Sequence, residues 1–244
     1  MENVNWFESW FDTSYYHTLY KNRDNKEAER FIGNLVDYIQ LPPHSRVLDL
    51  ACGKGRHSIT LFTHGYEVLG VDLSPQSIDH AEYFSNEQLQ FRVHDMREVI
   101  PGEHFDGVFN LFTSFGYFDS SEDNKKVLHA VHEMLNPQGV LLIDFMNASK
   151  VIANLVKEET KVVDDITFHI TRNYDGQHIF KHIRFEAEGQ EHNYMERVQA
   201  LQVADFASLL DTCGFDLIRT FGNFDLGKFD ETTSDRLILL ARKR

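Results

Sequence analysis

Two glycines and an aspartate stand at positions where residues of their type can bind a nucleotide. Residues 47–58 begin as a short apolar strand, pass through a turn that contains Gly53 and Gly55, and continue into a helix. Glycines at such a turn let a ligand approach the backbone, and N–H groups at a helix start favour negative or polar ligand groups. Asp72 ends the next expected strand, where a carboxylate can accept hydrogen bonds from both ribose hydroxyls of an adenosine.

Two classes of nucleotide-binding protein compete for this turn. A dinucleotide oxidoreductase prefers a third glycine, at the position where this chain has Ser58. Asp49 ends the first strand beside the turn, and its charge would repel the pyrophosphate of NAD. The same charge would attract the α-amino group, and at longer range the sulfonium, of S-adenosylmethionine. The charges therefore favour a methyl donor.

Residues 49–58 also resemble the nucleotide-binding signature of class I S-adenosylmethionine-dependent methyltransferases. The resemblance continues through further segments in the order that the family has them: residues 68–74, 95–96, 105–110 and 135–144, with Gln138 where the family often has glycine, and then 213–215 and 235–242. These motifs are specific for the superfamily and say little about the substrate. They imply S-adenosylmethionine as cofactor and S-adenosylhomocysteine as product.

The resemblance assigns the methionine end of the donor to the first turn. Gly53, Gly55 and the backbone near Ala51 would line it. Asn110, at the end of the fourth strand, would face the methionine or the transferred methyl group. Arg56 either reaches the donor carboxylate or lies exposed on the first turn of the helix.

The adenosine end is assigned to the second and third strands. Asp72 would hold the ribose hydroxyls, with Leu73 against the adenine. Asp95 would accept a hydrogen bond from the adenine amino group, and Met96 would supply a backbone N–H and packing.

Residues 1–45 are expected to form a helical lid over the donor. Tyr16, Tyr20 and Arg23 would then face the donor or the acceptor, although aromatic residues at helical spacing also commonly only pack a helix onto its neighbour. A general base is needed only if the acceptor is protonated, and no catalytic residue is assigned. Tyr16 and His17 are the candidates that the sequence offers.

Strands and helices alternate from residue 46 to 150, the expected donor-binding core. This alternation predicts an α/β fold with a Rossmann-like, doubly wound, mostly parallel sheet. In residues 161–202 the apolar pattern has mostly a period of two, which predicts a small antiparallel insertion over residues 151–202, on the substrate side. Residues 203–244 would add a helix and closing strands, with an antiparallel terminal strand. We expect one methyltransferase domain over residues 1–244.

The charge balance bears on the methyl acceptor. The chain has 24 Lys and Arg against 38 Asp and Glu, a net charge of −14 with histidine neutral, which disfavours a nucleic-acid partner. The aromatic run at residues 112–118 either packs in the core or forms a wall around the acceptor. We expect a small-molecule acceptor, with an amine-bearing one favoured. A tRNA or protein methyltransferase, and a regulatory protein that binds the donor without catalysis, stay open as alternatives.

Further expectations concern the class of protein. Two cysteines cannot form a disulfide framework, no Cys/His spacing matches a zinc site, and no metal is expected. No signal peptide and no apolar run long enough for a transmembrane helix is evident, which predicts a cytoplasmic protein without a membrane partner. Either a monomer or a homodimer is compatible with the sequence.

Overall fold

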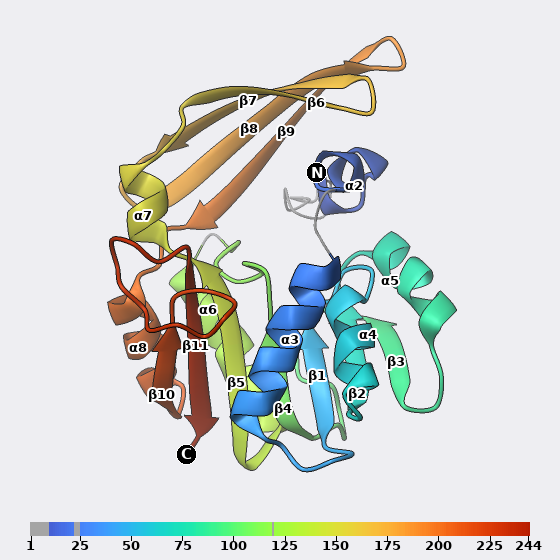
Figure 1. Ribbon diagram of the computed structural model, residues 1–244, viewed down its shortest axis with the longest axis vertical. Coiled ribbons are helices and arrows are strands. Elements are labelled where there is room, and N and C mark those ends of the chain that lie inside the picture. The colour runs from blue at the N-terminus through green and yellow to red at the C-terminus, as the bar shows by residue number, and fades with distance from the viewer. Residues whose placement is uncertain (1–9, 22–24, 119) are drawn as a thin grey trace.

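The computed structural model describes residues 10–21, 25–118 and 120–244. Its centre is a seven-stranded sheet with the strand order β10-β11-β5-β4-β1-β2-β3 (Figure 1). The strands are β1 (Arg46–Leu50), β2 (Glu67–Asp72), β3 (Leu89–Val93), β4 (Phe105–Asn110), β5 (Leu135–Met146), β10 (Phe215–Phe221) and β11 (Arg236–Lys243). Strand β11 runs antiparallel to both of its neighbours, β5 and β10, whereas the other adjacent strands of the sheet are parallel, which confirms the mostly parallel sheet with an antiparallel terminal strand.

Helices cover both faces of this sheet (Figure 1). On one face lie α3 (Asn25–Ile39), α4 (Arg56–Thr63) and α5 (Pro75–Ala81, followed by the 3₁₀ turn η1, Glu82–Phe84), and on the other α6 (Ser121–Met134) and α8 (Val203–Thr212). Side chains of β1 alternate between the faces, so that Leu48 packs towards α6 and α8 whereas Val47 packs towards α3 and α4. Each face thus has its own apolar core.

Strand β5 begins at Leu135, directly after α6 ends at Met134. Leu135 pairs with Phe105, and the register then shifts before Gly107 pairs with Val140. Pro137 lies in this irregular stretch, where its missing N–H interrupts no regular ladder.

A second sheet of four antiparallel strands follows α7 (Ala148–Ala153). It consists of β6 (Glu158–Val163), β7 (Ile166–Tyr174), β8 (His178–Ala187) and β9 (Gln190–Gln199). This sheet confirms the antiparallel insertion. Helix α2 (Ser14–Leu19) lies beneath it (Figure 1), and the two share an apolar cluster in which Trp10 and Leu19 pack against Phe168 and Ile183.

No helix within the described residues is both long and apolar enough to cross a membrane.

The glycine turn before α4 depends on close packing against β3. Gly55 has a φ of +82°, and a Cβ atom there would lie 2.7 Å from Phe91 Cζ. We expect Gly55→Ala to lower the free energy of unfolding by about 2–5 kcal/mol, because the left-handed conformation costs about 1–2 kcal/mol and the clash about 1–3 kcal/mol.

Gly65→Ala is the matched control for this substitution. Gly65 also has a positive φ, +90°, but a Cβ atom there would meet nothing within 4 Å. It should cost only the conformational part, about 1–2 kcal/mol. Denaturant unfolding of both variants measures the difference, and equal losses would mean that Phe91 does not constrain the turn.

Candidate active site

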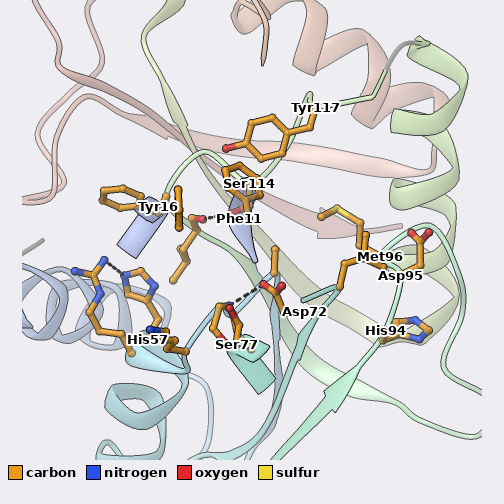
Figure 2. Close-up of a pocket in the computed structure, with 18 of the residues that line it drawn as sticks. Phe11, Tyr16, His57, Asp72, Ser77, His94, Asp95, Met96, Ser114 and Tyr117 are labelled. Carbon is orange, nitrogen blue, oxygen red and sulfur yellow. Dashed lines mark hydrogen bonds between the residues drawn. The ribbon is translucent and has the colours of Figure 1, made fainter. Parts of the chain in front are cut away.

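A cavity of about 300 Å³ opens where β1, β2 and β4 end. Figure 2 shows its walls, which come from four parts of the chain. The N-terminal segment contributes Phe11, Tyr16 and His17; the first turn contributes Ala51, Cys52, Gly53, Lys54, Arg56 and His57. The ends of β2 and β3 and the start of α5 contribute Asp72, Leu73, Ser77, His94, Asp95 and Met96; the loop after β4 contributes Leu111, Phe112, Ser114, Tyr117 and Phe118. The location agrees with the rule that open α/β sheets bind ligands at the carboxyl ends of their strands.

The first turn winds through left-handed backbone. Ala51, Gly53 and Gly55 have φ values of +65°, +54° and +82°. Gly55 is the N-cap of α4 but does not line the cavity, because it packs against Phe91. Ala51, Gly53 and Arg56 do line it.

At the floor of the cavity, the Asp72 carboxylate joins the first turn, which precedes α4, to the loop between β2 and α5. Its Oδ2 accepts a hydrogen bond from Gly53 N at 2.8 Å, and its Oδ1 accepts one from Ser74 N at 2.9 Å. Burial raises the pKa of Asp72, and the backbone N–H bonds oppose that rise. Each oxygen of a carboxylate can accept about two hydrogen bonds, so both oxygens retain the capacity to accept one from a ligand in the cavity.

Asp49 lies beneath the turn, and its position differs from our expectation. Its side chain is 1% exposed, does not line the cavity, and accepts a hydrogen bond from Ser58 Oγ at 2.6 Å. Strand β1 alternates its side chains between the two faces of the sheet, and Asp49 falls on the face that α4 covers. Burial raises the pKa of Asp49 to about 7, although the Ser58 bond opposes the rise.

Asn110 also lies behind the cavity wall, where we expected it to face the donor. It is 1% exposed, and its Nδ2 donates to the carbonyl oxygen of Leu50 at 2.9 Å, which holds β4 to the end of β1. Its buried Oδ1 has no hydrogen-bond partner among the described residues. Leu111, the next residue, lines the cavity instead.

Asp95 and Met96 both line the adenosine side of the cavity, together with Leu73. The Asp95 carboxylate, however, is already bound by Arg97, whose Nε lies 3.1 Å from each oxygen and whose Nη2 lies 2.6 Å from Oδ2. Burial alone would raise the pKa of Asp95, but the bonds and charge of Arg97 outweigh it and hold that pKa below its usual value.

The N-terminal segment, residues 10–20, has one side towards the cavity and the other towards the second sheet. Tyr16 and His17 line the cavity. Tyr20 does not: its hydroxyl donates to Glu196 on β9 at 2.7 Å, and Trp10 Nε1 donates to the same carboxylate at 2.8 Å. Arg23, named with these tyrosines in the sequence analysis, lies outside the described residues.

Several of these contacts have no signal in the sequence. Glu196 lies in a strand of alternating apolar and polar residues, where a charged residue usually faces solvent. The neighbouring sequence does not indicate that it binds the N-terminal segment. Asp12 accepts a hydrogen bond from Ser74 Oγ at 2.5 Å and so joins the N-terminal segment to the start of α5. The aromatic run after β4 is divided between two positions, since Phe115 is buried in the core whereas Tyr117 lines the cavity.

Within the described part of the chain, no group of three His, Cys, Asp or Glu residues is placed to hold a metal ion.

The raised pKa of Asp49 predicts a pH-dependent stability. Its value in the folded protein, about 7, lies above the usual 3.8. The folded state therefore binds the proton more tightly than the unfolded chain, and the stabilisation is lost as the pH rises through 7. Asp49→Asn, which stays neutral, avoids this loss, so between pH 5 and 8 its free energy of unfolding should gain about 3 kcal/mol relative to the wild type.

Asp230→Asn provides the control, because hydrogen bonds from Thr232 and Thr233 lower the pKa of Asp230 to about 2. Its stabilisation is lost only as the pH falls towards 2, so this variant should show no slope relative to the wild type between pH 5 and 8. Denaturant unfolding across that range measures both differences. A wild type and an Asp49→Asn variant with parallel pH profiles would contradict the raised pKa.

Comparisons with known proteins agree with this geometry. A family model described as a methyltransferase domain matches residues 41–202. The putative methyltransferase YqeM of Bacillus subtilis is 29% identical over an alignment of 214 positions, which covers 83% of this chain and 86% of the relative. The glycine/sarcosine N-methyltransferase of Aphanothece halophytica is 28% identical over an alignment of 256 positions, which covers 97% of this chain and 87% of the relative.

The fold agrees as well. The crystal structure of an S-adenosylmethionine-dependent methyltransferase from Clostridium acetobutylicum superposes with a TM-score of 0.79 at 19% identity, over 94% of this chain and 96% of that one. The family model covers both the strands that carry the cavity and the second sheet. The chain therefore belongs to the methyltransferase domain family, and it has the fold of an S-adenosylmethionine-dependent methyltransferase.

Proposed function

We propose that this enzyme transfers the methyl group of S-adenosylmethionine to the nitrogen of a small amine. The observation that carries the proposal is a single cavity with two chemically different ends. Asp72 supplies a carboxylate at one end, and Tyr16, Phe112 and Tyr117 supply aromatic surface at the other. Aromatic faces attract cations and exclude water, which suits a sulfonium methyl group beside an amine.

The residues at the first end fit the donor. Asp72 has capacity for the two ribose hydroxyls, and Leu73 and Met96 offer apolar surface for the adenine. The bound donor supplies a methyl group on a positively charged sulfur, and its transfer leaves S-adenosylhomocysteine.

Asp49 and Asp95 have different tasks in this proposal from those expected of them. Asp49 supports the turn from beneath through Ser58, and its charge acts on the ligand only at a distance. Asp95 is occupied by Arg97, so it contributes less to adenine binding than Asp72 does to the ribose. Gly55 shapes the turn without touching the donor.

The N-terminal segment acts as a lid in this proposal. Glu196 binds it at two points, Trp10 and Tyr20, and thereby holds it to the second sheet. On its other side Asp12 bonds to Ser74 at the start of α5. The second sheet contributes no residue to the cavity wall, so its part is to carry the lid. A covered cavity keeps water from the reacting groups and fixes their separation.

The acceptor class follows from the aromatic wall and from the charge. An amine attacks through its neutral form, and Tyr16 and His17 are the lid residues close enough to the cavity to act on its proton. The similarity to a glycine/sarcosine N-methyltransferase supports an amine, and the net charge of −14 disfavours a polyanionic acceptor.

The donor assignment predicts that Asp72→Ala lowers the affinity for S-adenosylmethionine at least 100-fold. The substitution removes two charge-assisted hydrogen bonds, each of which contributes about 1.5–3 kcal/mol. Calorimetric titration of the donor measures the loss. Asp79→Ala, which removes an exposed carboxylate from the neighbouring helix α5, should bind like the wild type. Equal affinities for Asp72→Ala and the wild type would contradict the ribose assignment.

The acceptor assignment predicts S-adenosylhomocysteine release with amines. The wild type is incubated with S-adenosylmethionine and a panel that contains glycine, sarcosine, ethanolamine, amino sugars and, separately, unfractionated RNA. We expect release at least tenfold above the background rate with one or more amines, rising with pH as more of the amine is neutral. Release with RNA alone would overturn the proposal.

A further inference from the structure

The loop that forms the aromatic end of the cavity contains two strained residues. Phe112 and Thr113 have φ values of +63° and +61°, in the left-handed region, and neither is a glycine. A β-branched residue is a genuine outlier there. Such a pair persists only where the surrounding structure restrains it. The ring of Phe112 lines the cavity, so the strain lies in the cavity wall itself.

One buried ion pair provides most of this restraint. Asp144, near the end of β5, is 1% exposed and accepts a hydrogen bond from Arg236 Nε at 2.8 Å. Its other oxygen accepts one from Phe112 N at 2.9 Å, and its backbone oxygen accepts one from Thr113 N at 2.8 Å. Arg236 Nη2 completes the set by donating to Thr113 Oγ1 at 2.9 Å. Two residues thus hold both strained amides and the threonine side chain.

The ion pair also acts on the ring that faces the cavity. The Arg236 guanidinium lies 5.7 Å from the centre of the Phe112 ring, and the Arg56 guanidinium, from the first turn, lies 5.4 Å from it. The far end of the loop is fixed separately, by a hydrogen bond from Gln199 N to Gly116 O at 2.8 Å. Arg236 therefore orients the start of the loop, residues 112–113, and with it the Phe112 ring.

We propose that Asp144 and Arg236 are positioning residues, which hold Phe112 and Thr113 in their strained conformation and so set the shape of the acceptor end of the cavity. This inference rests on the proposed function, because it gives that end of the cavity to the acceptor. Neither residue lines the cavity, and both act through the loop.

Amide hydrogen exchange tests the restraint without reference to turnover. Arg236→Lys keeps the charge but replaces the guanidinium, whose two nitrogens bond to Asp144 and Thr113, with a single nitrogen. In this variant the amides of Phe112 and Thr113 should exchange at least tenfold faster than in the wild type. Amides of β4 and of the interior of β5 should stay within twofold. Asp144→Asn should give the same local pattern. Lys150→Ala, which breaks the neighbouring exposed pair with Asp235, should change none of these amides.

A second-site variant tests whether the ion pair restrains backbone strain at Thr113 or only stabilises the loop in general. Asparagine adopts the left-handed conformation far more readily than threonine. Thr113→Asn combined with Arg236→Lys should therefore recover at least half of the lost protection. Exchange as fast in the double variant as in Arg236→Lys would show that strain is not what the ion pair restrains, and would overturn the inference. An even increase across the sheet in Arg236→Lys would overturn it as well.

Kinetics with the amine panel test the consequence for the acceptor. Arg236→Lys should lower kcat for S-adenosylhomocysteine release at least tenfold, while KM for S-adenosylmethionine stays within twofold. Unchanged kcat would contradict the positioning role. Calorimetry of the wild type with S-adenosylhomocysteine keeps the two proposals apart. Failure to bind refutes the proposed function, whereas binding together with wild-type exchange in Arg236→Lys refutes this inference alone.

Discussion

The double hydrogen bond at Asp72 is the interaction on which the rest of the site depends. Parallel strands bring their carboxyl ends to one edge, but they leave the loops that follow free to diverge. The Asp72 carboxylate prevents this by accepting from Gly53 in the first loop and from Ser74 in the second. Those same bonds offset part of the cost of burying the carboxylate, and the part that remains raises its pKa. A ligand hydroxyl then meets an acceptor that is already oriented.

The layer beneath the cavity keeps that edge in place. Asp49 bonds to Ser58, at the start of α4, and pairs in register with Gly70 on β2. A side chain on Gly70 would lie 2.6 Å from Phe91 and 2.8 Å from Ser58 Oγ. Glycine at this position therefore leaves room for the Asp49 carboxylate, the Ser58 side chain and the Phe91 ring to pack together. This close packing restrains the turn that lies above it.

Local patterns predicted the sheet and the donor side of the cavity, while contacts between distant segments did not follow from them. The strand, glycine turn and helix lie within one short stretch, so their geometry follows from residue type. A spacing pattern cannot tell whether Asp49 lines the cavity or lies one layer below, because strand alternation decides that only once the faces are known. Nor can it find Glu196, which is 186 residues from Trp10. The Asp95–Arg97 pair, although local, does not follow from the two residue types alone.

The central claim is that one cavity holds adenosine at Asp72 and presents the reacting sulfur to the aromatic loop after β4. A crystal structure of the complex with S-adenosylhomocysteine tests it most directly. In that complex both ribose hydroxyls should lie within hydrogen-bond distance of the Asp72 carboxylate, and the sulfur should lie beside Leu111 and Phe112. An adenosine bound elsewhere, or a sulfur that points away from this loop, would contradict the account.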